Sequence, residues 1–390
     1  MIYLDNAATS FPKPRGLADY MAEIISMRGG SFGRGGYASA IKNSEDVLTV
    51  RQKLARFFGS ERPEQIIFTK NATEALNTAI SGLLSRGDTV IVSPLEHNSV
   101  IRPLNMLGCN IITLPLLPDG SVDISALKKY HQPALVIINH ASNVSGIIND
   151  VELAAELCRK NGIPLLIDAS QSAGHIPLKA SWGAMIACAG HKGLLGPQGT
   201  GVLYIPQNIR LRPLTSGGTG TRSELINQPE ELPDRFESGT LNLPAILGLG
   251  YSLDYIERRG AKSIHAHEMK LTEYIISELS ELNDIHILFP ENKTRTPCIS
   301  FYSDTIDTVD FGNILDSDFG IAVRCGLHCA PAAHRAYGTL ETGTVRVSPG
   351  AFTKFSEAER FVYAVKKIIK GGHGDRKNCS ECKNAEEKSK

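Results

Sequence analysis

The sequence lacks an excess of charge of either sign, because 41 lysines and arginines are balanced by 41 aspartates and glutamates. A nucleic-acid-binding protein needs a basic surface, and an anionic membrane attracts one, so this balance predicts neither partner. Long hydrophobic runs are also absent, since none approaches the ~20 residues that cross a bilayer. We therefore expect no nucleic-acid partner and no membrane partner.

Cysteine is sparse as well, because eight residues in a chain of 390 are too few for a disulfide scaffold. The first residues, MIYLDNAATSFPKP, lack the basic and apolar stretches of an export signal. Both observations predict a cytoplasmic protein with reduced thiols. The remaining composition is that of a globular protein, and at ~150 residues per domain the length suggests two or three domains.

Short apolar runs alternate with amphipathic segments through the first half of the chain. We expect strands at 66–69, 89–93, 111–114, 135–139, 165–168, 184–189 and 201–205. We expect helices between them at 44–58, 72–84, 99–107, 125–130 and 151–161. This alternation predicts an α/β fold with a mostly parallel sheet that helices cover on both faces. Ligands of such a sheet bind at the carboxyl ends of its strands.

The predicted division of the chain has four parts. Residues 1–15 form an N-terminal arm, and residues 16–245 form the large domain. Residues 246–370 form a smaller α+β C-terminal domain. The tail, 371–390, has almost no apolar side chains, so we expect it to be disordered.

An aspartate and a lysine follow two of the predicted strands. Asp168 ends the run that begins at residue 165, and Lys192 comes just after the run 184–189. This pair suits a pyridine cofactor, because the carboxylate keeps the ring nitrogen protonated and the lysine holds the aldehyde as a Schiff base. Taken singly, a helix-capping aspartate and a surface lysine explain the same residues.

A helix start follows the strand at 66–69. Asn71 suits the N-cap and Glu74 the third helical position, as in a capping box. The amides of Ala72 and Thr73, with the Thr73 hydroxyl, are then free at the positive end of the helix, where a phosphate binds. An ordinary capped helix is the alternative.

Two more polar residues follow strand ends. His97 could lie flat on a cofactor ring and pass protons near neutral pH, or it could be an ordinary loop histidine. Asn143 supplies a neutral hydrogen-bonding group to the same edge of the sheet.

The segment from Arg324 to Pro331, RCGLHCAP, places a cysteine near an arginine and a histidine. Such a thiol can favour its reactive thiolate form. The alternative is a metal site made by Cys325, Cys329 and a histidine. A second cysteine pair at zinc spacing is missing, so we expect no metal site. Arg346, on a later strand, suits either a clamp for a substrate carboxylate or a structural salt bridge.

Nine motifs in this order carry a family resemblance: YLDNAATS, NATEALN, EHNS, SNVSG, DASQSAG, GHKGLLGPQGTG, ESGTLN, RCGLHCAP and TVRVSPG. The chain resembles the cysteine desulfurases, which are class V, fold-type I enzymes that use pyridoxal 5′-phosphate (PLP). The resemblance covers about residues 3–355. It implies a PLP-binding large domain, a small C-terminal domain that carries the cysteine loop, and a homodimer.

The resemblance implies a role for each candidate residue around the cofactor ring. Lys192 carries PLP, Asp168 pairs with the pyridine nitrogen, Gln171 contacts the ring hydroxyl and His97 stacks on the ring.

Other residues are implied for the phosphate and for the substrate. Thr73 and His191 bind the phosphate, and Thr240 reaches the phosphate of the partner subunit. Asn143 and Arg346 hold the substrate carboxylate.

The implied reaction converts L-cysteine to L-alanine and leaves the sulfur as a persulfide on Cys329, from which a sulfur-acceptor protein can take it. Lys192 removes the Cα proton, and His97 moves protons to or from the substrate thiol. Selenocysteine lyase activity, another class V lyase or aminotransferase reaction, and a non-catalytic sulfur-carrier scaffold are the alternatives.

The chain departs from the commoner family pattern at three positions. Ala189 stands where many relatives have a hydroxyl residue, and Cys325 and Leu327 replace a threonine and a histidine. The short spacing around Cys329 resembles the branch with a compact catalytic loop. In the tail, Cys379 and Cys382 suit half of a zinc site, a thiol pair that takes sulfur from Cys329, or no function.

Overall fold

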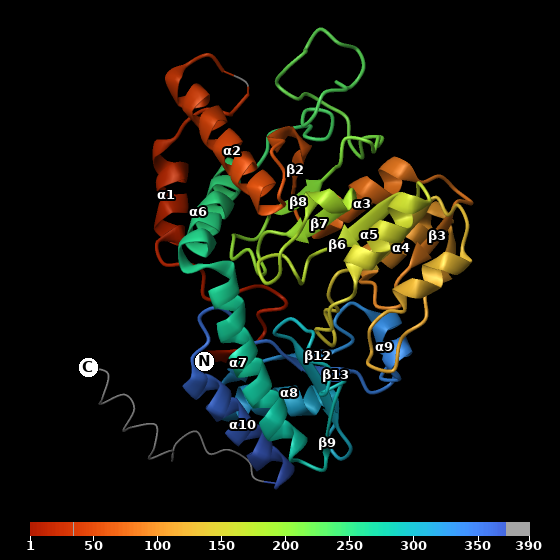
Figure 1. The fold of residues 1–390 in the computed structure, drawn as a ribbon. Coiled ribbons are helices and arrows are strands. Elements are labelled where there is room, and N and C mark those ends of the chain that lie inside the picture. Colours follow the sequence, from red (N-terminus) through yellow and green to blue (C-terminus); the bar gives the residue numbers. More distant parts are fainter. Residues whose placement is uncertain (34, 372–390) are drawn as a thin grey trace.

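The protein is described by a computed structural model that covers residues 1–33 and 35–371. The predicted disordered tail and its cysteine pair, Cys379 and Cys382, lie outside the described residues, apart from residue 371. Figure 1 shows a large sheet surrounded by helices, with a smaller sheet and its own helices below it.

The large sheet has seven strands, and their order decides which strand ends lie next to one another at the edge where the site residues were predicted. The order is β2 (Ile66–Thr69), β8 (Gly201–Tyr204), β7 (Met185–Ala189), β6 (Leu165–Asp168), β5 (Leu135–Asn139), β3 (Thr89–Val92) and β4 (Asn110–Thr113). Strand β8 runs antiparallel to both of its neighbours, and the other neighbouring pairs are parallel. The predicted α/β fold with a mostly parallel sheet is confirmed.

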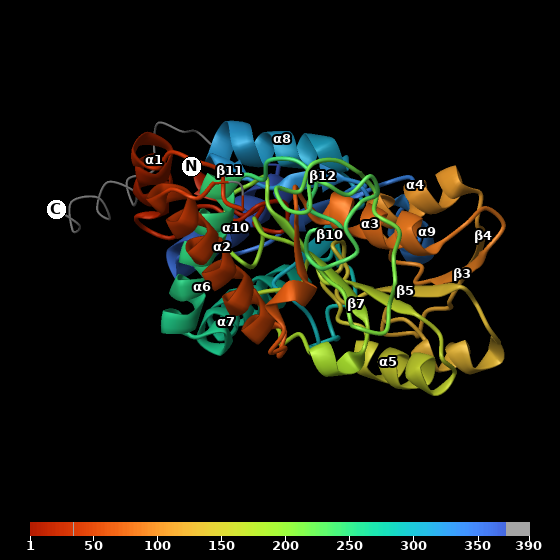
Figure 2. The same cartoon turned by 90° about the horizontal axis from the view of Figure 1, so that it is seen from above.

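Helices cover both faces of this sheet (Figure 2). Successive side chains of a strand point to opposite faces. Ile137 therefore packs with α3 (Ala72–Leu83) and α4 (Asn98–Leu107). Its neighbour Ile138 belongs to the core formed with α2 (Ala38–Phe57) and α5 (Val151–Lys160). All five residues of β5 are buried, as expected for a strand covered on both sides.

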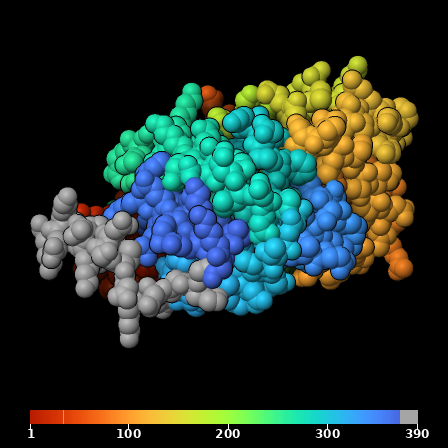
Figure 3. All heavy atoms as spheres, turned by 90° about the horizontal axis from the view of Figure 1, so that it is seen from below, coloured from red at the N-terminus to blue at the C-terminus, as the bar shows by residue number. Residues whose placement is uncertain are grey.

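The C-terminal part contains a second core. Its sheet has the order β12 (Arg324–Gly326), β13 (Thr344–Val347), β10 (Ile299–Ser303) and β9 (Ile285–Ile287), and all neighbours are antiparallel. Phe301 and Phe361 pack there with residues of α7 (Ala261–Ser280), α8 (Thr308–Phe319) and α10 (Phe355–Ile369). Figure 3 shows these C-terminal segments, coloured teal to blue, side by side on one face of the molecule.

The N-terminal residues join this second core. Strand β1 (Ile2–Tyr3) pairs in parallel with β11 (Ile321–Ala322), and Leu4 is fully buried in the C-terminal cluster. Residues 5–13 then run to the segment that follows β7, where the Ser10 amide donates to the His191 carbonyl at 3.0 Å.

The remaining elements pack mainly with the core around the large sheet. They are α1 (Leu17–Met27), α6 (Leu243–Arg259), α9 (Pro331–Tyr337) and three 3₁₀ turns at Pro63–Gln65, Ile124–Lys129 and Ala180–Trp182. Within the described residues, no helix is both long and apolar enough to cross a bilayer.

Some predicted element boundaries were wrong. Helix α2 begins at Ala38 rather than at residue 44, because its first turns bury only the small or polar side chains of Ala40 and Asn43. The large apolar residues that the helix buries begin at Val47, because Ile41 is exposed. The segment predicted as a helix at 125–130 is a 3₁₀ turn.

Candidate active site

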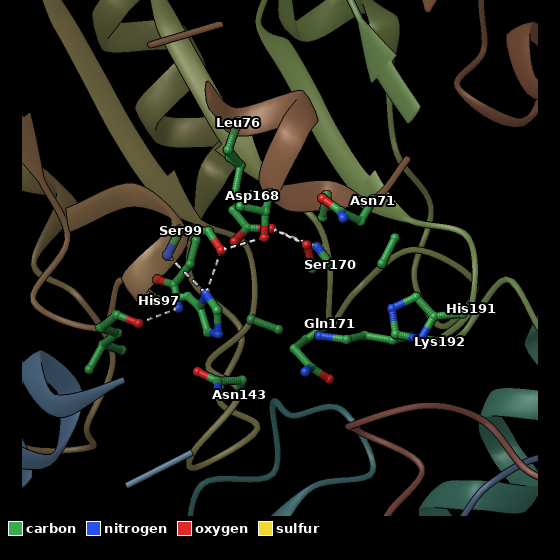
Figure 4. Close-up of a pocket in the computed structure, with 16 residues that line it drawn as sticks. Asn71, Leu76, His97, Ser99, Asn143, Asp168, Ser170, Gln171, His191 and Lys192 are labelled. Carbon is green, nitrogen blue, oxygen red and sulfur yellow. Dashed lines mark hydrogen bonds between the residues drawn. The ribbon is translucent and has the colours of Figure 1, made fainter. Parts of the chain in front are cut away.

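A cavity of about 220 Å³ opens at the carboxyl ends of the parallel strands. Figure 4 shows the polar side chains that point into it, with His97 and His191 on opposite sides and Asp168 between them. The lining residues are Asn71, Ala72, Thr73, Leu76, Leu95, His97, Ser99, Asn139, Ala141, Asn143, Asp168, Ser170, Gln171, Ala189, His191 and Lys192. The cavity therefore brings together eight of the predicted site residues: Ala72, Thr73, His97, Asn143, Asp168, Gln171, His191 and Lys192.

The N-terminus of α3 forms one end of the cavity. Asn71 is the N-cap, as predicted, and its Oδ1 accepts from the Glu74 amide at 2.9 Å. The Glu74 side chain accepts from the Lys70 amide, so the predicted capping box is displaced by one residue. The Thr73 hydroxyl lies 2.8 Å from Ser99 Oγ. The positive helix end and these hydroxyls make this end of the cavity suitable for an anion.

Asp168 is buried at the end of β6 and is held by its own turn. Its Oδ1 accepts from the Ser170 amide at 2.9 Å and from the Ser170 hydroxyl at 2.5 Å. Two donors on one oxygen fix the direction of the carboxylate. Ser170 was missed in the sequence, although a serine two residues after an aspartate is a common turn-forming pattern.

Lys192 lies just beyond β7, on the cavity wall. Burial lowers the pKa of its amine to about 8, with Arg346 and Arg324 lowering it further and Asp168 opposing them. Relative to a lysine with the usual pKa, the fraction of neutral amine near pH 7 rises about 300-fold. A neutral amine is the form that attacks an aldehyde or removes a proton.

His97 is a neutral ring with a fixed orientation. Its Nδ1 accepts from the Ser99 amide at 3.0 Å, so the proton of the neutral ring lies on Nε2. Burial lowers the pKa of His97 to about 4, which keeps the ring uncharged at neutral pH. The same residue is the N-cap of α4.

His191 lies opposite His97 and is held by the N-terminal segment. Its carbonyl accepts from the Ser10 amide and from Lys13 Nζ, each at 3.0 Å. Burial lowers the pKa of the His191 ring to about 4, and its buried Nδ1 has no hydrogen-bond partner. Lys13 and Ser10 were not predicted as site residues, because only the fold brings them next to His191.

Gln171 and Asn143 line the cavity, and the NH₂ group of each side chain donates a hydrogen bond to a backbone carbonyl. Gln171 Nε2 donates to the Ala7 carbonyl at 3.0 Å, and Asn143 Nδ2 donates to the His328 carbonyl at 2.7 Å. These bonds leave the amide oxygens to face a ligand.

Arg346 lies next to this cavity but does not line it. Its side chain is 1% exposed, and it donates to the Asn143 carbonyl at 3.0 Å and to Asp5 Oδ1 at 2.7 Å. The sequence suggested either a clamp for a substrate carboxylate or a structural salt bridge for Arg346, and the salt bridge is present. Arg346 Nε is nevertheless buried without a partner, so the guanidinium still has a donor to offer.

Cys329 is exposed and is fixed to the rim of the cavity. Its carbonyl accepts from the Asn98 amide at 2.9 Å, next to His97, and Arg324 Nη2 lies 3.1 Å from its Sγ. Both His328 and Cys329 have left-handed backbones, with φ of 50° and 58°. Such backbones cost roughly 1–3 kcal/mol each and persist only where other contacts hold them.

The other polar groups of the cysteine loop point away from Cys329. The His328 ring bonds Thr344 Oγ1 at 2.8 Å, whereas Arg324 Nη2 is within hydrogen-bond distance of the thiol. Cys325 faces inward, where a side chain on Gly312 would collide with its sulfur. In residues 1–33 and 35–371, these cysteines and His328 do not form a metal-binding cluster.

Thr240 lies away from this cavity. It is exposed and lines a separate surface pocket with Thr215, Gly217 and Asn242. Its predicted contact with the phosphate of a partner subunit stays a prediction.

Comparisons with known proteins agree with this geometry. The family model described as "Aminotransferase class-V" matches residues 2–361. A "Probable cysteine desulfurase" of Methanothermobacter thermautotrophicus is 35% identical over 361 residues, which are 89% of each chain. A "Cysteine desulfurase" of Escherichia coli O139:H28 is 30% identical, over 94% of this chain and 93% of the relative. Among solved structures, the apo cysteine desulfurase of Thermococcus onnurineus NA1 superposes with a TM-score of 0.88, at 33% identity and 95% coverage of both chains.

Proposed function

The chain belongs to the cysteine desulfurases of the class-V aminotransferase family, and from this premise we propose that it converts L-cysteine to L-alanine and captures the sulfur on Cys329. The observation that carries the proposal is the arrangement of Lys192, Asp168 and His97 in one cavity, with the exposed Cys329 bonded to its rim. The cofactor of the proposed reaction is PLP.

The cavity residues fit PLP on grounds of their own chemistry. Asp168 is a buried carboxylate with a fixed direction, as a protonated ring nitrogen requires. The α3 N-terminus, the Thr73 hydroxyl and the unpartnered His191 Nδ1 offer donors to a phosphate. Ala189 contributes a methyl group where a hydroxyl would add one more donor. When bound, PLP supplies an electron-accepting ring that stabilises the charge left at Cα after its proton leaves.

Lys192 is the base in this proposal. Its amine removes the Cα proton of the substrate, and its lowered pKa keeps a useful fraction of the amine neutral. We assign to His97 the holding and passing of a proton at Nε2, beside the substrate thiol. The Ser99 amide prevents the ring from turning, because it donates to Nδ1.

Cys329 performs the sulfur transfer. Its thiolate attacks the substrate Sγ, so that an S–S bond forms while the Cβ–Sγ bond breaks. The bonding electrons stay on Cβ, which takes up a proton and becomes the methyl group of alanine. Arg324 Nη2, 3.1 Å from Cys329 Sγ, is placed to donate a charge-assisted hydrogen bond to the thiolate. A sulfur-acceptor protein can then remove the persulfide sulfur.

We propose that Arg346 and Asn143 hold the substrate carboxylate. The free Nε of Arg346 and its location beneath Asn143 support this role. Asp5 accepts a hydrogen bond from Arg346 Nη2, so a substrate carboxylate that binds this side of the guanidinium must displace part of that contact. We also propose a homodimer in which Thr240 reaches the partner's phosphate site.

The experiment is a single turnover with L-cysteine, with alanine and protein-bound persulfide measured together. The purified protein should form both in equal amounts, and Cys329→Ser should bind the cofactor but form no persulfide. A variant that still releases alanine and sulfide at the parental rate would indicate a lyase that does not need Cys329. A protein that binds no cofactor would instead be a non-catalytic scaffold.

A further inference from the structure

Three potential metal ligands lie together outside the residues assigned above: His175, His265 and Glu268. One ligand atom of each lies within 4.8 Å of the other two. Within residues 1–33 and 35–371, this is the one cluster of three or more such side chains at that spacing. We propose that the cluster binds one divalent transition-metal ion of the zinc type.

Two separate segments supply the ligands. His265 and Glu268 are three residues apart on α7, so they lie on one face of the helix. His175 comes from the loop that follows β6, and its Nδ1 lies 2.8 Å from Glu268 Oε2. Two imidazoles and one carboxylate are the protein ligands of many zinc sites that keep a fourth position for water.

A simple ion pair explains His175 and Glu268 but not His265. The His265 Nδ1 is buried and has no hydrogen-bond partner, and its ring centroid lies 6.1 Å from that of His175. A metal needs a free ring nitrogen of this kind, because the imidazole binds the ion through a nitrogen lone pair.

Charge and space both allow an ion. Glu268 is 2% exposed, and its Oε2 lies 2.8 Å from His175 Nδ1, so one hydrogen lies between the two atoms. An ion bound between them replaces this hydrogen, which leaves to solvent as a proton. A tetrahedral ion with bonds of about 2.1 Å needs ligand atoms about 3.4 Å apart, so no separation within the 4.8 Å limit has to close by more than roughly 1.4 Å. A cavity of about 20 Å³ beside His175 and Glu268 has room for one water as the fourth ligand.

The cluster touches the segment that carries the active-site lysine. A side chain on Gly193 would lie 2.8 Å from His175 Nε2, so the histidine ring packs directly on the backbone next to Lys192. The small cavity is lined by both His175 and Lys192. A bound ion would therefore fix the position of Lys192 as well as that of α7.

The test is a Co²⁺ titration of the full-length protein loaded with PLP, without L-cysteine, whose thiolate would compete for the ion. Cys329, Cys379 and Cys382 are replaced by serine in the starting protein, so that their thiols cannot bind cobalt. We expect one equivalent of bound cobalt by equilibrium dialysis, with visible bands typical of four nitrogen and oxygen ligands. His265→Ala removes a direct ligand, so it should weaken binding by more than the ~10–100-fold that the loss of an outer-shell partner costs.

His267→Ala is the matched control, since this residue lies on the same helix but bonds the Thr353 carbonyl instead. It should bind cobalt like the starting protein. His265→Gln guards against misfolding, because it keeps most of the side-chain volume, and an unchanged cofactor spectrum shows that it is folded. Zn²⁺ should raise the melting temperature of the starting protein but not that of His265→Gln. The proposal is wrong if the starting protein binds no cobalt, or if both histidine positions affect binding equally.

Discussion

The choice between Cys329 and Cys325 as the sulfur-accepting residue can be tested by replacing each with serine. Cys329 is exposed on the rim of the cavity, with Arg324 beside its sulfur. Cys325 is four residues earlier, on β12, and its sulfur points toward Gly312 in the interior. Cys329→Ser should therefore abolish persulfide formation, whereas Cys325→Ser should retain most of the activity.

The small loss of activity expected for Cys325→Ser follows from the protonation of the Cys325 thiol. Burial raises the pKa of Cys325 to about 11. At pH 7.5 only about one Cys325 thiol in 3,000 is then a thiolate, which is the form that attacks sulfur. Even if a substrate reached it, Cys325 would react slowly. Cys325→Ser should instead lower the stability, by about 1–3 kcal/mol, because a hydroxyl replaces a thiol in a half-buried apolar site.

The assay is a single turnover with L-cysteine, followed by alkylation and peptide mapping of the persulfide. The modified peptide should contain Cys329 in the parent and in Cys325→Ser, and no modified peptide should appear in Cys329→Ser. Thermal melting measured in parallel separates a loss of stability from a loss of chemistry. Persulfide on Cys325, or normal turnover without Cys329, would refute the assignment.

Three further predictions concern the cavity and its neighbour Arg346. Lys192→Ala should lose both the absorbance of the lysine-bound cofactor and turnover, while Lys179→Ala, on an exposed lysine, should keep both. Arg346→Ala should raise KM for cysteine strongly, with a loss of about 2–4 kcal/mol in kcat/KM, while the cofactor spectrum persists; an unchanged kcat/KM would place the carboxylate site elsewhere. The rate at which the cofactor-free protein binds PLP should rise with pH and level off above about pH 8, because the neutral Lys192 amine is the reacting form. A rate that keeps rising toward pH 10, as an ordinary lysine requires, would contradict the lowered pKa.

The sequence predicted most of the residues that line the cavity because their position depends on local features. Each of the short apolar runs at β3, β5, β6 and β7 ends next to a polar residue, and parallel strands bring these ends to one edge. Once the alternation of strands and helices was recognised, the neighbourhood of His97, Asn143, Asp168 and Lys192 followed.

What the sequence did not predict depends on contacts between distant segments. The partner of Arg346 is Asp5, 341 residues away, and pattern reasoning offered a salt bridge without naming this partner. The inward direction of Cys325 depends on the packing of β12 against α8, which a loop-like sequence does not specify.

The cluster of His175, His265 and Glu268 also depends on a contact between distant segments, which the sequence did not predict. No metal site was expected, because the sequence lacks a second cysteine pair at zinc spacing near Cys325 and Cys329, and His175 lies 93 residues from Glu268. Yet α7 already carries two of the three ligands in the sequence, as His265 and Glu268 at helical spacing. The third ligand depends on the loop after β6, which folds toward α7 because Gly174 and Gly193 allow their backbones to touch. A side chain on Gly174 would meet the Gly193 carbonyl oxygen at 2.1 Å. The two glycines that let the lysine segment pack closely thus also bring the third ligand to the helix, so any ion bound there acts directly on the segment that carries Lys192.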